Sequence, residues 1–90
     1  MLLLATFDLS SADIALFEEH EAAVLPLLAR YGGRLLQRVR SLDSAFEIHL
    51  IEFDRDDGFE SYRNDPDRLA TQPLFERSGA EIMMTPVKSV

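Results

Sequence analysis

The sequence contains no cysteine, and this absence excludes three kinds of chemistry. Without thiols the chain forms no disulfide bond, holds no thiolate zinc site and has no cysteine nucleophile. An absence of cysteine is compatible with any compartment and gives no sign of an oxidising one. Any function must therefore depend on other side chains.

Long hydrophobic runs are missing as well. The apolar start MLLLATF is far too short to span a bilayer, which takes about twenty apolar residues in a helix. No basic residue precedes the apolar stretch, and it continues directly into a strand-like pattern, so we expect no signal peptide. These features predict a soluble cytoplasmic protein.

Basic residues are few, since nine lysines and arginines stand against sixteen aspartates and glutamates, for a net charge of −7. Nucleic-acid binders need a basic face to neutralise phosphates, and anionic membranes attract basic segments, so we expect neither partner. The hydrophobic fraction of 47% is ordinary for a globular protein. Ninety residues without a repeat or linker predict a single domain over 1–90.

Hydrophobic patterning predicts four strands and two helical regions. The strands are expected at residues 2–8, 34–40, 46–53 and 80–87. A bent helix is expected over roughly 11–31, with Ser10 or Ser11 as its N-cap and a kink caused by Pro26. The order βαββαβ is typical of the α+β, ferredoxin-like fold, a four-stranded antiparallel sheet with helices on one face. In that fold the first and third strands are central, and the other two form the edges.

Two helical regions cover only one face of such a sheet, yet both predicted faces are apolar. One face carries Leu3, Ala5, Phe7, Ile51 and Phe53, and the other carries Leu2, Leu4, Phe46, Ile48 and Leu50. Either face left in water would expose an apolar patch of roughly several hundred Å². The sequence therefore predicts a homodimer through the sheet face, without deciding which face packs on the helices.

Three segments carry a resemblance to a known family: YGGRLL at 31–36, IEF at 51–53 and SYRNDPDRL at 61–69. In their order and spacing the chain resembles the dimeric α+β barrel superfamily. Within it, the chain looks most like a small bacterial family of unknown function, related to the antibiotic-biosynthesis monooxygenase and muconolactone-isomerase-like domains. The resemblance implies two protomers whose sheets close a barrel with a small ligand inside.

The resemblance also implies an activity, the cofactor-independent oxygenation or isomerisation of an aromatic or quinone-like compound. His20, Tyr62 and Arg68 fall at ligand-facing or rim positions of the relatives. In this chain His20 replaces an aromatic residue, Tyr62 replaces a common tryptophan, and Arg68 replaces a common tyrosine. Any ligand of this chain is therefore expected to differ from that of its relatives.

His49 is the first candidate for chemistry, because it lies mid-strand among apolar neighbours and histidine is the residue type that exchanges protons most readily near neutral pH. On a face lining the barrel interior, it would orient a ligand or act as a general base. The alternative, which the sequence favours, is a histidine that bonds to a neighbour and serves packing alone. His20, near the apolar seam of the first helix, is expected to be half-buried or to close the pocket.

Arg34 and Arg38 are predicted to share one face of the second strand, where they would clamp a carboxylate ligand. Charge protection of the sheet edge is the favoured alternative. Glu47 or Glu52 is expected to pair with one of these arginines across the strands. Such a pair is usually structural, and Glu52 remains a candidate ligand contact.

Metal and cofactor sites are not expected. The two histidines have no partner at i, i+4, and DRDD at 54–57 lacks the closing glutamate of a calcium loop. No Ser–His–Asp motif, nucleotide loop or flavin fingerprint is visible. Two hypotheses follow: a dimer that binds or converts a small aromatic or apolar metabolite, or a non-catalytic assembly module with a filled barrel.

Overall fold

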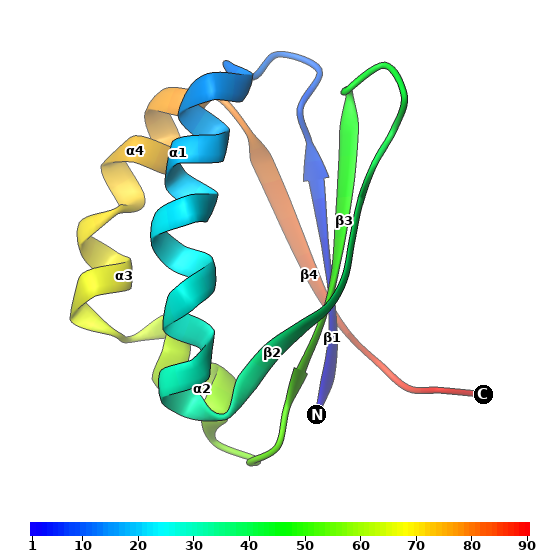
Figure 1. Ribbon diagram of the computed structural model, residues 1–90, viewed down its shortest axis with the longest axis vertical. Coiled ribbons are helices and arrows are strands. Elements are labelled where there is room, and N and C mark those ends of the chain that lie inside the picture. The colour runs from blue at the N-terminus through cyan, green and yellow to red at the C-terminus, as the bar shows by residue number, and fades with distance from the viewer.

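The computed structural model describes all residues from 1 to 90 and consists of two layers, an antiparallel sheet and a layer of helices (Figure 1). The elements are β1 (Leu2–Asp8), α1 (Ile14–Val24), the 3₁₀ helix η1 (Leu25–Tyr31), β2 (Gly33–Arg40), β3 (Phe46–Phe53), α2 (Gly58–Arg63), α3 (Pro66–Ala70), α4 (Gln72–Ser78) and β4 (Glu81–Val87). The strand order β2-β3-β1-β4 places the first and third strands in the centre. The predicted ferredoxin-like fold is confirmed.

The first helix differs from its prediction at both ends. Its N-cap is Asp13, whose carboxylate accepts a hydrogen bond from the Leu16 N–H at 3.2 Å. Ser10 is not the cap, because its hydroxyl donates to Asp8 at 2.6 Å. The α-helix ends at Val24 and continues as η1, since Pro26 has no N–H for the helical ladder. None of the helices combines the length and apolar character needed to cross a bilayer.

Two glycines turn the chain from η1 into β2. Gly32 has a φ of 71°, the left-handed conformation that commonly ends a helix. At Gly33 a Cβ atom would lie 2.6 Å from the Phe53 ring, so only glycine fits between η1 and β3. The segment YGGR therefore serves as a helix end and a close packing point.

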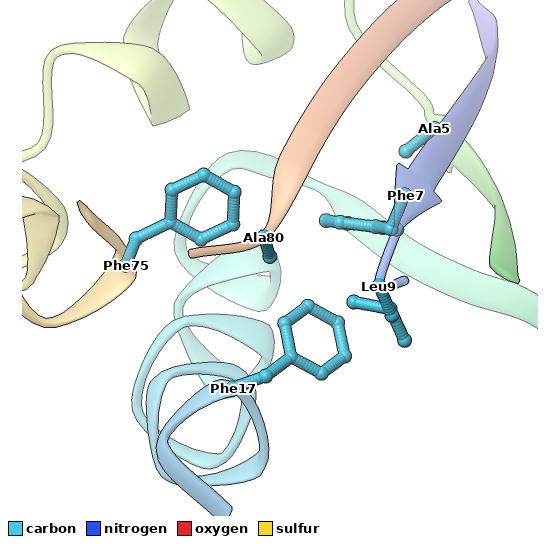
Figure 2. Packing of buried hydrophobic residues seen from close by; sticks show 6 residues of the cluster. All are labelled: Ala5, Phe7, Leu9, Phe17, Phe75 and Ala80. Atoms are coloured by element: carbon cyan, nitrogen blue, oxygen red, sulfur yellow. The ribbon is translucent and has the colours of Figure 1, made fainter. Parts of the chain in front are cut away.

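All helices lie on one face of the sheet, which we call the covered face (Figure 1). Its buried apolar residues are Leu3, Ala5, Phe7, Ile51 and Phe53. Phe7 packs against Phe17 of α1 with ring centroids 5.2 Å apart, and Phe75 of α4 joins the same cluster (Figure 2). The sequence predicted two apolar faces without showing which of them packs on the helices. These contacts show that it is the face that carries Phe7.

The opposite side of the sheet has no helix against it, and we call it the open face (Figure 1). By strand register its apolar side chains are Leu2, Leu4, Val39, Phe46, Ile48, Leu50, Met83 and Val87. Met83 is 66% exposed and Phe46 is 43% exposed, and none of the set is fully buried. The second apolar face expected from the sequence is therefore present and uncovered within one chain.

A β-bulge in β2 overturns one prediction. The register places Arg34 opposite Glu52 and Arg38 opposite His49, with an irregularity between Leu35 and the residue two positions on. The extra residue reverses the alternation of side chains along the strand. Arg34 therefore belongs to the open face and Arg38 to the covered face, so the prediction that they share a face is wrong.

Candidate functional site

A cavity of about 150 Å³ lies between the covered face and the helices. Its walls are mostly apolar, with nine hydrophobic residues among fourteen. Both layers contribute, for example Phe7 and Ile51 from the sheet and Val24 and Phe75 from the helices. The polar side chains that interrupt this wall are His20, Glu21, His49, Arg68 and Gln72. The cavity therefore joins an apolar interior to a small set of ionisable groups.

His49 projects into this cavity from the middle of β3 and is only 1% exposed. Its Nε2 lies 2.5 Å from the Glu47 carboxylate, and its ring lies 4.7 Å from the Phe7 ring. Nδ1 has no partner in the chain, and no solvent-shielded side-chain nitrogen or oxygen is left unpaired. His49 is one of the residues that line the cavity, and Nδ1 is its ring nitrogen without a hydrogen bond in the chain.

Glu47 is also 1% exposed, and it is held by two arginines of β2. Arg38 Nε donates to it at 2.9 Å and Arg40 Nε donates at 2.6 Å. Glu18 of α1 accepts from both guanidinium groups, so the network joins β2, β3 and α1. No other carboxylate in the sheet has so many charged partners.

The pKa of Glu47 follows from this network. Burial alone would raise the pKa of the carboxyl group, but hydrogen bonds from His49, Arg40 and Arg38 outweigh burial and lower it. An ionised carboxylate only accepts hydrogen bonds, so His49 Nε2 must carry a proton. In a neutral His49 ring, this contact places the proton on Nε2 and leaves the lone pair on Nδ1.

A second histidine lies on the helix side of the cavity. His20 Nδ1 is 3.2 Å from Glu21 Oε1, and both residues are buried. The His20 ring packs on Phe75 with centroids 5.0 Å apart. The sequence led us to expect that His20 is either half-buried or closes the pocket. In the structure His20 is buried and forms part of the cavity wall.

Tyr62 and Arg68 form another part of the helix-side wall. Tyr62 is buried, with its hydroxyl 3.5 Å from the Val24 carbonyl, and burial raises its pKa while Arg68 opposes that shift. The Arg68 guanidinium lies over the Tyr62 ring, 5.1 Å from its centroid. The Arg68 N–H donates to Asp65 Oδ1 at 3.0 Å, so the N-cap of α3 positions this residue.

The structure brings together three of the six residues proposed from sequence: His49, His20 and Tyr62. Arg38 is one step removed, because it contacts Glu47 behind His49. Arg34 and Glu52 pair with each other on the open face, away from the cavity. His49 lies on the covered face and lines a cavity formed within a single chain, whereas the sequence led us to expect the ligand in a barrel between two chains.

Sequence reasoning did not nominate Glu21 or Gln72 as site residues, and it gave Glu47 only a pairing role. Glu21 has the helical spacing of Phe17 and Leu28 on one side of the helix, which would have indicated burial. Gln72 starts a separate short helix after Thr71, and no single helical period links it to Tyr62. Nowhere in the chain do three histidine, aspartate or glutamate side chains come close enough to hold a metal ion.

Comparisons with known proteins address the fold. No protein-family model matches the sequence. No curated protein matches it either. Among solved structures, SnoaB, a cofactor-independent oxygenase from Streptomyces nogalater, superposes with a TM-score of 0.73 at 17% identity, covering 99% of this chain and 93% of SnoaB.

Two further structures agree. A proposed antibiotic biosynthesis monooxygenase from Nitrosomonas europaea gives a TM-score of 0.69 at 9% identity, covering 97% of this chain and 98% of that one. An uncharacterized NIPSNAP domain protein from Burkholderia xenovorans gives 0.62 at 14% identity, covering 99% and 96%. The fold is that of the antibiotic-biosynthesis monooxygenase-like domains. The resemblance noted in the sequence is thus confirmed at the level of the fold, while identities this low carry no activity across.

Proposed function

We propose that this protein binds a single-ring aromatic compound in the cavity and that His49 removes a proton from a ring hydroxyl group. The observation that carries the proposal is the buried Glu47–His49 pair, because His49 lines a ring-sized and mostly apolar cavity and its Nδ1 makes no hydrogen bond within the chain. A dry apolar cavity of about 150 Å³ accepts benzene, whereas sites for drug-sized ligands start at about 300 Å³. The volume therefore favours one ring over several.

The pair has the parts that a general base needs. The tautomer fixed by Glu47 leaves a basic lone pair on Nδ1, within the space a bound hydroxyl group would occupy. When Nδ1 takes a proton, the ionised Glu47 stabilises the imidazolium across the 2.5 Å contact. Arg38 and Arg40 keep that carboxylate ionised. Glu47 is thus a positioning residue for His49.

Proton removal prepares a reaction with oxygen. The resulting phenolate is electron-rich, and its ring carbon transfers electrons to O₂ and forms a bond to one oxygen atom. The ring hydroperoxide then loses water, leaving a quinone. Overall, a hydroxyarene and O₂ give a quinone and water, with all electrons supplied by the substrate. This cofactor-independent route is supported by the shared fold with SnoaB, which is an oxygenase of that kind.

We also propose that two copies associate through their open faces in a cytoplasmic homodimer. The support is the row of half-buried and exposed apolar side chains across all four strands, too large a patch to remain in water. The net charge of −7 speaks against nucleic acid and anionic membranes as partners. The same face supports the second candidate function, an assembly module without catalysis.

The test begins with a ¹H–¹⁵N NMR titration of the protein with phenol and the cresols, followed by oxygen uptake and product analysis under labelled O₂. We expect amide shifts at residues lining the cavity and one labelled oxygen atom in a quinone product. His49→Gln keeps a polar side chain but loses the basic nitrogen, so uptake should stop while binding persists. Glu47→Gln should slow uptake without abolishing binding.

Two outcomes would contradict the proposal. If no ring shifts the amides of cavity residues, the cavity is not a ligand site, and assembly alone becomes the better function. If His49→Gln consumes oxygen as fast as the natural protein, after subtraction of the reaction without protein, His49 is not the base.

A further inference from the structure

Arg68 is the one arginine that lines the cavity, and it has no carboxylate partner. Six other arginines lie within 4.0 Å of an acidic side chain: Arg30, Arg34, Arg38, Arg40, Arg55 and Arg63. Acidic residues outnumber basic ones by sixteen to nine, so carboxylates are not scarce. An arginine left without one at a cavity is therefore a distinctive feature of this chain.

The Arg68 side chain is nevertheless held in place. Its guanidinium lies 5.1 Å from the centroid of the Tyr62 ring, and Nη1 donates to the Arg63 carbonyl at 3.3 Å. An arginine has five N–H donors, so most of those on Arg68 remain available. Arg68 is half-buried, and two other lining residues, Gln72 and Ile82, are exposed, so the cavity opens to solvent near these side chains.

Glu21 is the opposing charge in the cavity wall. It is buried, and its Oε1 is already hydrogen-bonded to His20 at 3.2 Å. Glu21 therefore has an ionisable partner within the chain, while Arg68 has no acidic partner. The charge that a ligand has to complement is the positive charge at the opening.

We propose that the ligand is an anion, a single-ring aromatic carboxylate whose carboxylate group binds Arg68 while the ring enters the apolar cavity. A guanidinium group matches a carboxylate with two parallel hydrogen bonds, which fixes orientation as well as charge. Arg68 comes from the helix layer and His49 from the sheet layer, so a bound ring lies between them. This inference rests on the function proposed above and names its substrate class.

The experiment compares benzoate, benzyl alcohol and benzylamine as probes, because the three share one ring and differ in charge. Dissociation constants come from ¹H–¹⁵N NMR titrations at constant ionic strength. Benzoate should bind at least about tenfold more tightly than benzyl alcohol, as expected for a hydrogen bond between charged groups. Arg68→Gln should remove about that tenfold advantage, and Arg68→Lys should keep part of it, since lysine retains the charge without the planar fork.

Arg77→Gln is the matched control. Arg77 is exposed on α4, lies outside the cavity and also lacks a carboxylate within 4.0 Å, so its removal changes the net charge equally. This variant should bind benzoate like the natural protein. Amide spectra of each variant report whether it remains folded.

The outcomes separate this inference from the proposed function. Tighter binding of benzylamine than of benzoate would overturn the inference, because Glu21 would then set the charge of the ligand. Equal binding of benzoate and benzyl alcohol, or equal losses in Arg68→Gln and Arg77→Gln, would overturn it as well and leave the ring-binding cavity intact. If none of the three rings binds, the proposed function itself fails.

Discussion

The two faces of the sheet are similarly apolar but differ in their ionisable groups. The covered face buries Glu47 and His49, which bond to each other, and Glu47 also accepts hydrogen bonds from two arginines of the same chain. On the open face the charges lie at the strand ends, where Arg34 pairs with Glu52. Alternate residues of β3 thus serve two different surfaces.

The difference follows from the cost of burying charge. A buried carboxylate needs partners in defined positions, and here β2 supplies Arg38 and Arg40, which also pair with Glu18 of α1. An apolar surface only needs another apolar surface of matching shape, which a second copy of the chain would provide in the proposed dimer. We therefore assign chemistry to the face completed within one chain and association to the face left open.

The largest expected effect is on association. Ile48→Glu places a charge in the middle of the open face, where a second copy would bury it without a partner. Light scattering at micromolar concentration should give twice the 10.2 kDa chain mass for the natural protein and one chain mass for the variant.

Leu42→Glu is the control for that experiment. Leu42 lies in the turn between β2 and β3 and is 107% exposed, so the same added charge should leave the dimer intact. A natural protein that stays monomeric, or a dimeric Ile48→Glu variant, would contradict the role assigned to the open face.

The next effect in size is on stability. Glu47→Gln removes the charge of a buried carboxylate and leaves the half-buried Arg38 and Arg40 groups with Glu18 alone, and breaking such a pair costs about 3 kcal/mol. Glu52→Gln removes an exposed pair and should cost less than about 1 kcal/mol. Urea unfolding in the Ile48→Glu background measures both without a contribution from association. Equal costs would show that the two faces do not differ in their electrostatics.

The fold could be predicted because its signals are local. Alternating apolar residues mark the strands, and proline and glycine positions mark where helices break. The errors have local causes too. Ser10, Ser11 and Asp13 all suit an N-cap, and only the structure shows that Asp8 already binds the Ser10 hydroxyl. A choice among three competent caps depends on neighbours in space.

The candidate site was less predictable, because its geometry depends on which face of the sheet each strand residue points to and on packing between segments far apart in the sequence. His49 was identified from its residue type and strand position, but with both faces apolar the sequence could not assign its side of the sheet. The one-residue bulge at Leu36 has no glycine or proline beside it to signal it in the sequence. This bulge places Arg34 and Arg38 on opposite faces of the sheet. Arg68 lies on one of three short helices, whose directions no single helical period encodes.

The smallest expected effect is the pH dependence of the Glu47 contribution. Because the folded protein lowers the pKa of Glu47, the ionised form is favoured in the folded state. Its stabilisation is complete above the unfolded pKa, about 4.3, and is lost as the pH falls through the lowered folded value.

Protonated Glu47 resembles glutamine, so the difference in unfolding free energy between the natural protein and Glu47→Gln should be widest near neutral pH and narrow below about pH 4. Asp65, whose pKa is about 2, weakens both proteins over the same acidic range and cancels in the difference. A difference that stays constant from neutral pH down to pH 3 would mean that Glu47 acts through its shape, and the contrast between the two faces would then not be one of charge.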